Sequence, residues 1–259
     1  MSRTVDLPMI QKRVQAADLG KRFHAWIRHK LWLVGIIGAW AYAPCLWWPL
    51  GVWSMACLWH AVRNAPSVTT AVRMGWLWGF GFHAMGLHWI SMACWVDPDQ
   101  WSWLSPFLLL GIPALLALFP AFVAGIVTWV LSCRLLTRHQ HMVWVWPVIW
   151  FCVEYIQGHL WTGFPWNLSA YVWTGCWPMT QAVAWVGVYV WGAVTWLAIG
   201  VCFLSSHTTK RLCVGLGLFA LVYGAGWWRL HTTPIHFHPH MWIRCVQPAI
   251  PQHLSLIHI

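Results

Sequence analysis

The sequence predicts an all-α polytopic membrane bundle of about seven transmembrane helices, followed by the first strand of a second, soluble domain. Of the 259 residues, 60% are hydrophobic and only 8% are charged, whereas a soluble domain has about 25% charged residues. The mean hydropathy is +0.59. So few charges cannot cover a soluble surface of this size, and the high hydrophobicity excludes intrinsic disorder.

Seven apolar stretches reach or approach the length of about 20 helical residues that a bilayer requires. The first is short and is extended by residues 23–27. Its end, Ala41-Tyr42-Ala43, mimics a signal-peptidase site, but the following Pro44 and the long basic leader favour an uncleaved first span. The seven stretches are Leu31–Ala43, Leu46–Val62, Met74–Cys94, Trp103–Ser132, Met142–Gln157, Met179–Phe203 and Leu212–Trp228.

The fourth stretch is long and contains Pro106, Pro113 and Pro120, so one crossing and two crossings must be compared. Lys and Arg gather on the cytoplasmic side of membrane proteins. One crossing places thirteen of the fifteen Lys and Arg on that side and leaves only Arg229 and Arg244 outside, whereas two crossings divide them eleven to four. We therefore expect one kinked crossing, a cytoplasmic N-terminus, and an external segment after residue 228.

This topology divides the chain into three parts. Residues 1–30 form a basic cytoplasmic segment, residues 31–228 form the transmembrane helical domain, and residues 229–259 form a linker with one strand. The pattern of Met241–Gln247 predicts that strand, and Pro248 ends it. Because a single strand is not stable alone, it is expected to open a further domain.

The sequence indicates no cofactor, metal site or nucleic-acid partner. His236, His238 and His240 alternate in the linker, but no acid or Cys accompanies them, so we expect no metal there. The nine cysteines include no C-x-x-C pair, and most lie in apolar runs, which favours packing over metal binding. The basic residues form no aromatic-interleaved patch of the kind that binds single-stranded nucleic acid.

Few polar residues interrupt the apolar stretches. Glu154 is the only acid in one, and an ionisable residue in a span indicates function, although simple exposure at the interface is an equal alternative. His83 and His88 lie five residues apart, which does not place them on one helix face, so each is expected to be packed and hydrogen-bonded. Gly75 and Gly79 form a G-x-x-x-G pattern that allows close helix packing.

Residues 154–171, EYIQGHLWTGFPWNLSAY, form the richest segment and lie on the outer side between the fifth and sixth stretches. Gly158 and Gly163 favour turns, and Pro165 is a rigid break. The aromatic side chains between them are typical of an interfacial belt. They are equally typical of an ordered loop with aromatic walls that receives a lipid acyl chain from the outer leaflet.

Three segments resemble the bacterial apolipoprotein N-acyltransferases. Residues 154–171, with the core Thr162-Gly163-Phe164-Pro165-Trp166, resemble the periplasmic loop of that family. Residues 79–90, GFGFHAMGLHWI, look like its third-span motif, and residues 244–252, RCVQPAIPQ, look like the first strand of its nitrilase-like α/β domain. The resemblance covers about residues 30–253, in the family's order and on the expected sides.

The resemblance implies an acyltransferase of the bacterial inner membrane. Such enzymes take an acyl chain from a phospholipid donor, hold it as a thioester on a cysteine, and pass it to the α-amino group of a diacylglyceryl-modified lipoprotein. In the family, the Glu-Lys-Cys catalytic set belongs to the nitrilase-like domain, beyond residue 259. No cysteine of this sequence matches it, so we assign no catalytic residue and expect residues 1–259 alone to be inactive in a transfer assay.

The resemblance also implies substrate-binding residues. Trp166 is expected to line the substrate entrance, with Phe164, Pro165 and Tyr171 shaping it, and Glu154 is also expected to bind substrate. The sequence departs from the family at Gln157, where many relatives carry Arg, and at Ser255 and Leu256, which replace a Lys-Trp pair. The alternatives are an unrelated seven-span transporter and a non-catalytic membrane partner.

Overall fold

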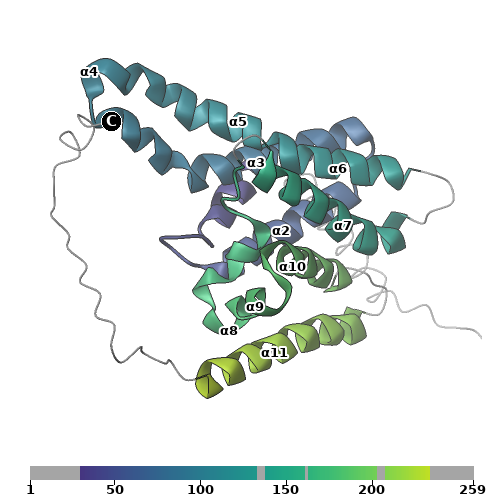
Figure 1. The fold of residues 1–259 in the computed structure, drawn as a ribbon. Coiled ribbons are helices and arrows are strands. Elements are labelled where there is room, and N and C mark those ends of the chain that lie inside the picture. Colours follow the sequence, from purple (N-terminus) through teal and green to yellow (C-terminus); the bar gives the residue numbers. More distant parts are fainter. Residues whose placement is uncertain (1–29, 133–137, 161–162, 203–207, 234–259) are drawn as a thin grey trace, which may run out of the picture.

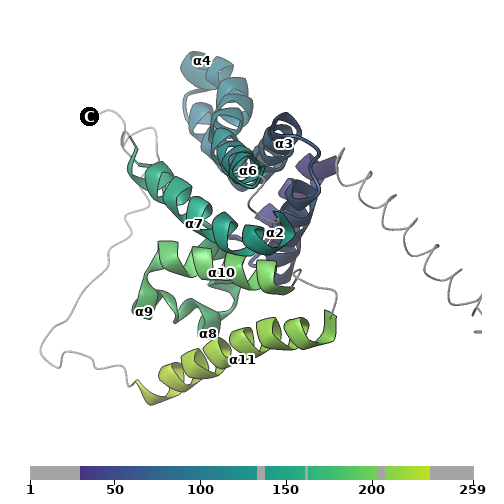
Figure 2. The same ribbon diagram turned by 90° about the vertical axis from the view of Figure 1, so that its right-hand side faces the viewer.

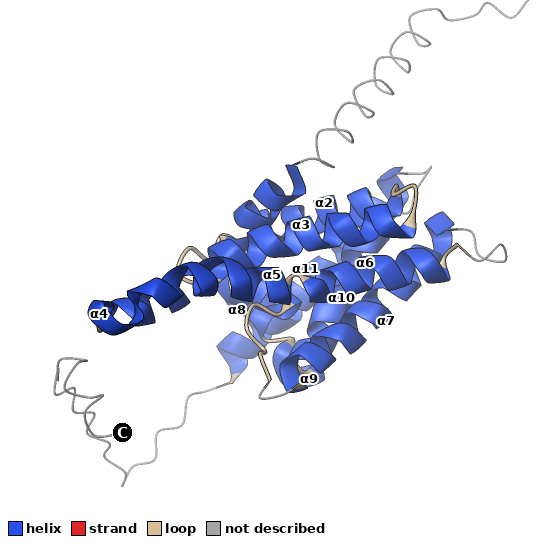
Figure 3. Ribbon diagram, turned by 90° about the horizontal axis from the view of Figure 1, so that it is seen from above, coloured by secondary structure: helices blue, strands red, loops and turns tan. Residues whose placement is uncertain are grey.

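The computed structural model describes residues 30–132, 138–160, 163–202 and 208–233. Every regular element within these ranges is helical, as predicted (Figure 3). The predicted strand Met241–Gln247 lies outside the described residues, as do the linker histidines His236, His238 and His240.

The described chain forms a bundle of helices joined by short helical turns (Figure 1). A helix over Lys30–Ala39 comes first. The later elements are α2 (Trp48–Arg63), α3 (Val68–Gly86), η1 (His88–Trp95), α4 (Pro98–Trp101), η2 (Ser102–Leu104), η3 (Phe107–Gly111), α5 (Ile112–Leu116), α6 (Leu118–Val130), α7 (Arg138–His159), η4 (Ser169–Gly175), α8 (Trp177–Thr180), α9 (Val183–Val186), α10 (Val188–Cys202) and α11 (Thr208–Thr232).

Two helical stretches of the described chain are long and apolar enough to cross a membrane, namely Pro98–Val130 and Cys213–Thr232. A third is added if the bent pair formed by Trp177–Val186 and Val188–Cys202 is one span. The predicted number of seven is not confirmed by this measure. Length is one reason, because α2 has 16 residues and α10 has 15, fewer than the roughly 20 of a full crossing.

The sixth predicted stretch, Met179–Phe203, is not one straight helix. Gly187 has φ of 77° and ends α9, and the helices on its two sides are bent by 119°. A left-handed glycine ends helices because it has no Cβ to clash in that conformation. Hydropathy alone does not predict this bend, because the residues on both sides of Gly187 are apolar.

The fourth predicted stretch, Trp103–Ser132, falls mostly within one helical run of 33 residues, Pro98–Val130, which is compatible with a single crossing. It contains a 3₁₀ turn at η2 and a π-helical turn at η3, close to Pro106 and Pro113. Prolines remove backbone donors, so such irregular turns are expected near them. The α4 end of this run projects from the bundle beside η1, which follows α3 (Figure 1).

Close packing of α3 on α5 and α6 depends on its small residues. A Cβ atom added at Gly75 would collide with the carbonyl oxygen of Pro120, and one added at Gly79 would meet Pro120 and Ala117. Small residues allow this approach in membranes, where helix association depends on close contact. The packing role predicted for the G-x-x-x-G pattern is thus confirmed.

Polar contacts also join the first three helices. The Ser54 hydroxyl of α2 donates a hydrogen bond to the Val34 carbonyl oxygen over 2.7 Å. It accepts one from the indole N–H of Trp78 in α3 over 2.8 Å. One small polar side chain therefore satisfies two buried partners from neighbouring helices.

A tryptophan cluster joins α7 to α10 at the centre of the bundle. Trp146 and Trp196 are fully buried, and their ring centroids lie 5.3 Å apart. The ring centroid of Trp150 lies 4.2 Å from that of Trp196.

The last helix, α11, lies along the edge of the bundle and contacts α10 and α8 (Figure 2).

Candidate functional site

The segment after α7 turns back on the helix that precedes it. The backbone N–H of Phe164 donates to the Gln157 carbonyl oxygen over 3.0 Å, and the Gln157 side-chain amide donates to the Phe164 carbonyl oxygen over 3.4 Å. Gln157 therefore holds Phe164 through both its backbone and its side chain. We call residues 163–169 the outer loop, after the side of the membrane on which the sequence predicts it to lie.

Two residues of the outer loop have left-handed backbone conformations. Gly163 has φ of 76°, and a Cβ there would collide with the Gly158 carbonyl oxygen, so the turn requires glycine. Asn167 has φ of 56°, a conformation that Asn adopts more readily than most residues. The glycine turn predicted at Gly163 is thus confirmed.

Glu154 fixes the far end of the outer loop. Its Oε1 accepts hydrogen bonds from the Ser169 backbone N–H over 2.8 Å and from the Ser169 hydroxyl over 2.7 Å. The indole N–H of Trp196 in turn donates to the Ser169 hydroxyl over 2.9 Å. The tryptophan cluster of the core thereby connects through Ser169 to the carboxylate.

Glu154 is not exposed at the interface, because its side chain is only 6% accessible. Its second oxygen, Oε2, has no hydrogen-bond partner in the described part of the chain and faces α10 at Gly192. The alternative of simple interfacial exposure is therefore wrong. The sequence identified the residue but not its partner, since Ser169 lies fifteen positions away in an irregular segment.

Above this anchor, three aromatic rings form a continuous surface. The Trp166 ring stacks on Trp89 of η1 with centroids 4.9 Å apart and planes 17° apart. Phe164 lies 5.2 Å from Trp166. Trp166 and Trp89 remain 42% and 48% exposed. We call Trp89, Phe164 and Trp166 the aromatic patch.

Sequence reasoning placed Phe164 and Trp166 in the site but did not pair Trp89 with them. The only available signal was that Trp89 belongs to the 79–90 motif, one of the three segments that carry the family resemblance. Pro165 lies between the two loop members of the patch and is half-buried. Tyr171 packs against the hydrophobic core instead, so it stands apart from the patch.

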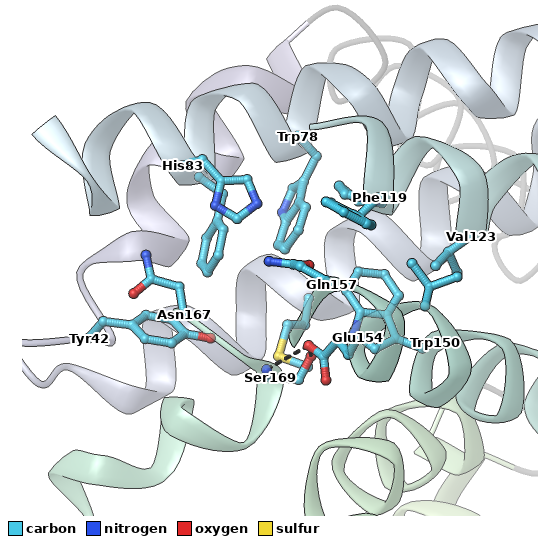
Figure 4. A pocket seen from close by; sticks show the side chains of 14 residues that line it. Tyr42, Trp78, His83, Phe119, Val123, Trp150, Glu154, Gln157, Asn167 and Ser169 are labelled. Carbon is cyan, nitrogen blue, oxygen red and sulfur yellow. Dashed lines mark hydrogen bonds between the residues drawn. The ribbon is translucent and has the colours of Figure 1, made fainter. Parts of the chain in front are cut away.

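A small cavity lies directly beneath the outer loop (Figure 4). It is lined by α2, α3, α6 and α7 and by the loop itself, and its apolar wall includes Trp78, Phe82 and Trp150. Six polar side chains also reach it, unusually many for so apolar a chain. They are Tyr42, His83, Glu154, Gln157, Asn167 and Ser169.

The two histidines of the third predicted stretch have different surroundings. His83 is 4% exposed and lines the cavity, but its Nδ1 has no hydrogen-bond partner among the described residues. The expectation that it is hydrogen-bonded is therefore wrong for this atom. His88 is exposed, and its Nδ1 bonds the Met85 carbonyl oxygen over 2.7 Å, as expected.

The geometry of the aromatic patch favours contact with an apolar ligand. The aromatic patch offers flat apolar rings at the protein surface, and its loop is held by a buried carboxylate. No cysteine is among the residues that line the cavity. The described part of the chain contains no group of three or more His, Cys, Asp or Glu side chains that could hold a metal ion.

Comparisons with known proteins agree with this description. The family profile "Apolipoprotein N-acyltransferase N-terminal domain" matches residues 34–204. The apolipoprotein N-acyltransferase of Rhodopseudomonas palustris is 31% identical over 239 residues, covering 85% of this chain and 42% of that protein. That of Brucella melitensis is 34% identical over 187 residues, covering 70% and 34%. That of Rickettsia typhi is 27% identical over 233 residues, covering 85% and 44%.

The matched residues include the whole aromatic patch and its anchor at Glu154 and Ser169. The chain spans less than half the length of each of these curated relatives. Because the profile covers well over half of this sequence, the chain belongs to the apolipoprotein N-acyltransferase family, and residues 34–204 correspond to its N-terminal domain.

Proposed function

We propose that residues 31–228 form the membrane domain of an enzyme that crosses the bacterial inner membrane seven times. In this topology the N-terminus is cytoplasmic, and the outer loop and the segment after residue 228 are periplasmic. The distribution of Lys and Arg supports it, since one crossing by residues 103–132 leaves only Arg229 and Arg244 outside.

The reaction proposed for the intact enzyme is acyl transfer from a phospholipid to a diacylglyceryl-modified lipoprotein. A cysteine thiolate attacks the ester carbonyl of the phospholipid, forms a thioester and releases the lysophospholipid. The α-amino group of the lipoprotein then attacks the thioester, an amide forms, and the thiol is released. The membrane domain contributes by binding lipid, and the reacting groups belong to the nitrilase-like domain of the family.

One observation carries this role for the described residues, namely the aromatic patch on an anchored loop. Trp166 stacks on Trp89 and stays 42% exposed, so the exposed part of its side chain can contact an acyl chain. Phe164 and Pro165 extend the apolar surface. Glu154 acts from below as the anchor, and Tyr171 connects the loop to the core. An unrelated transporter is not favoured, because the family match covers residues 34–204.

The variant Trp166→Ala in the intact enzyme tests this role. We expect kcat/KM for the phospholipid to fall about tenfold, which corresponds to a loss of about 1.4 kcal/mol of contact with the acyl chain. The melting temperature is expected to change little, because 42% of the side chain is exposed and the loop stays anchored at Ser169. A phospholipid-to-lipopeptide transfer assay measures the kinetics.

The matched control is Trp177→Ala, which removes another exposed tryptophan, 72% accessible, from α8. Its kinetics should equal those of the wild type. Wild-type kinetics in Trp166→Ala, or an equal loss in both variants, would contradict the role of the aromatic patch.

A further inference from the structure

The cavity beneath the outer loop contains polar groups whose bonding the protein leaves incomplete. Nδ1 of His83 and Nδ2 of Asn167 are both buried, and neither has a hydrogen-bond partner within the described residues. The two side chains line the same cavity, His83 from α3 and Asn167 from the outer loop (Figure 4).

Two buried nitrogen atoms without hydrogen-bond partners lower the stability of the protein. Leaving a buried donor or acceptor without a partner costs about 1–3 kcal/mol, and more than nine in ten buried polar groups in proteins are paired. The described protein atoms do not supply the partners. A small polar ligand inside the cavity would supply them.

The size of the cavity limits this ligand. It offers about 30 Å³ to the centres of water molecules, and roughly 10–15 Å³ is enough for one water. There is therefore room for two waters. Each water needs two to four polar partners, and the side chains of Tyr42, Gln157 and Ser169 are also at the wall.

We propose that this cavity is a site for two ordered waters, which bond His83 Nδ1 and Asn167 Nδ2. The waters join α3 to the underside of the outer loop. His83 is then a positioning residue, because it acts on the loop only through the waters. The site does not depend on the acyl-transfer reaction.

The approach of Asn167 to α3 supports this arrangement. A Cβ atom added at Gly86, at the end of α3, would collide with the amide nitrogen of Asn167. The glycine therefore lets the loop amide lie directly against the helix whose His83 faces the same cavity. The waters would fill the space that remains between the two.

Electron cryo-microscopy of the intact enzyme in lipid nanodiscs, at a resolution that shows waters, tests the site directly. We expect two densities in the cavity, one within about 3 Å of His83 Nδ1 and one within about 3 Å of Asn167 Nδ2. A dry cavity, or a protein atom bonded to each nitrogen, would overturn the proposal.

A second test uses the apolar variant His83→Phe. If waters bond His83, the variant leaves them with too few partners, and we expect the melting temperature to fall by about 2–4 °C. We also expect faster hydrogen–deuterium exchange of residues 163–169, with α11 unchanged. If the cavity is dry, the variant removes an unsatisfied group, and the melting temperature stays the same or rises.

Two further variants keep this test interpretable. His88→Phe, on an exposed histidine outside the cavity, should leave the exchange of residues 163–169 at the wild-type rate. His83→Gln retains a polar group that reaches the waters, so it should recover most of the stability lost in His83→Phe. Equal losses in His83→Phe and His83→Gln would contradict the proposal, since volume rather than water bonding would then explain them.

Discussion

A Glu154→Ala variant of the intact enzyme is expected to lose most of its transfer activity and about 3 kcal/mol of stability, with a lower melting temperature. The carboxylate accepts two hydrogen bonds from Ser169, from its N–H and its hydroxyl. Hydrogen bonds to charged groups contribute about 1.5–3 kcal/mol each, and the two are not fully additive because they share one acceptor. A total near 3 kcal/mol follows.

Removing a buried charge can also stabilise a protein, because the charge no longer has to be desolvated. We expect the loss to dominate here, since Ala leaves both Ser169 donors buried without an acceptor and leaves a void beside Gly192. The outer loop then loses its fixed end, and the aromatic patch loses its support.

Glu154→Gln is the matched control, because its amide oxygen can still accept both hydrogen bonds. It should retain more than half of the stability that Glu154→Ala loses. Thermal unfolding in detergent and the transfer assay measure both variants. Unchanged stability and activity in Glu154→Ala would contradict the role of the carboxylate as the anchor of the outer loop.

Gly35→Ala is expected to destabilise the bundle by about 3 kcal/mol or to prevent its folding. A Cβ atom at Gly35 would collide with the Trp78 carbonyl oxygen and lie 2.7 Å from the Phe82 backbone nitrogen. The obstacle is the backbone of α3, which cannot rotate away as a side chain can. Overpacking costs typically 1–3 kcal/mol, and this site lies at the upper end because two helices must separate.

Gly217→Ala in α11 provides the comparison for Gly35→Ala. Nothing lies within 4 Å of a Cβ at Gly217, so this substitution should leave the melting temperature nearly unchanged. Yield of folded protein by gel filtration and the melting temperature are the measurements. Wild-type stability in Gly35→Ala would show that the helices do not approach as closely as described.

The sequence predicted those features that depend on composition and local order. Low charge and high hydropathy predicted an all-helical membrane bundle, and the spacing of Gly75 and Gly79 predicted close packing on a neighbouring helix. The isolated acid Glu154 was identified because ionisable residues are costly within apolar stretches. The Gly163–Trp166 segment was identified from its order of Gly, Pro and aromatic residues and from the family resemblance.

The features that the sequence could not supply depend on contacts between distant residues. The stacking of Trp89 on Trp166 joins segments 77 positions apart, and no local pattern distinguishes Trp89 from the other 26 tryptophans. Hydropathy also did not register the bend at Gly187, since apolar residues flank it on both sides. The sequence leaves exposure of Glu154 at the interface open, because the burial of its side chain and its hydrogen bonds from Ser169 depend on tertiary packing.

The side of the membrane on which Trp166 lies is measured most directly by thiol labelling in spheroplasts. In a variant of the intact enzyme with its native cysteines replaced by Ala, Trp166→Cys should react with a membrane-impermeant maleimide added outside. Pro66→Cys, in the exposed turn between α2 and α3, should react only after permeabilisation. Labelling of Trp166→Cys only after permeabilisation would place the aromatic patch in the cytoplasm and contradict its role at the outer leaflet.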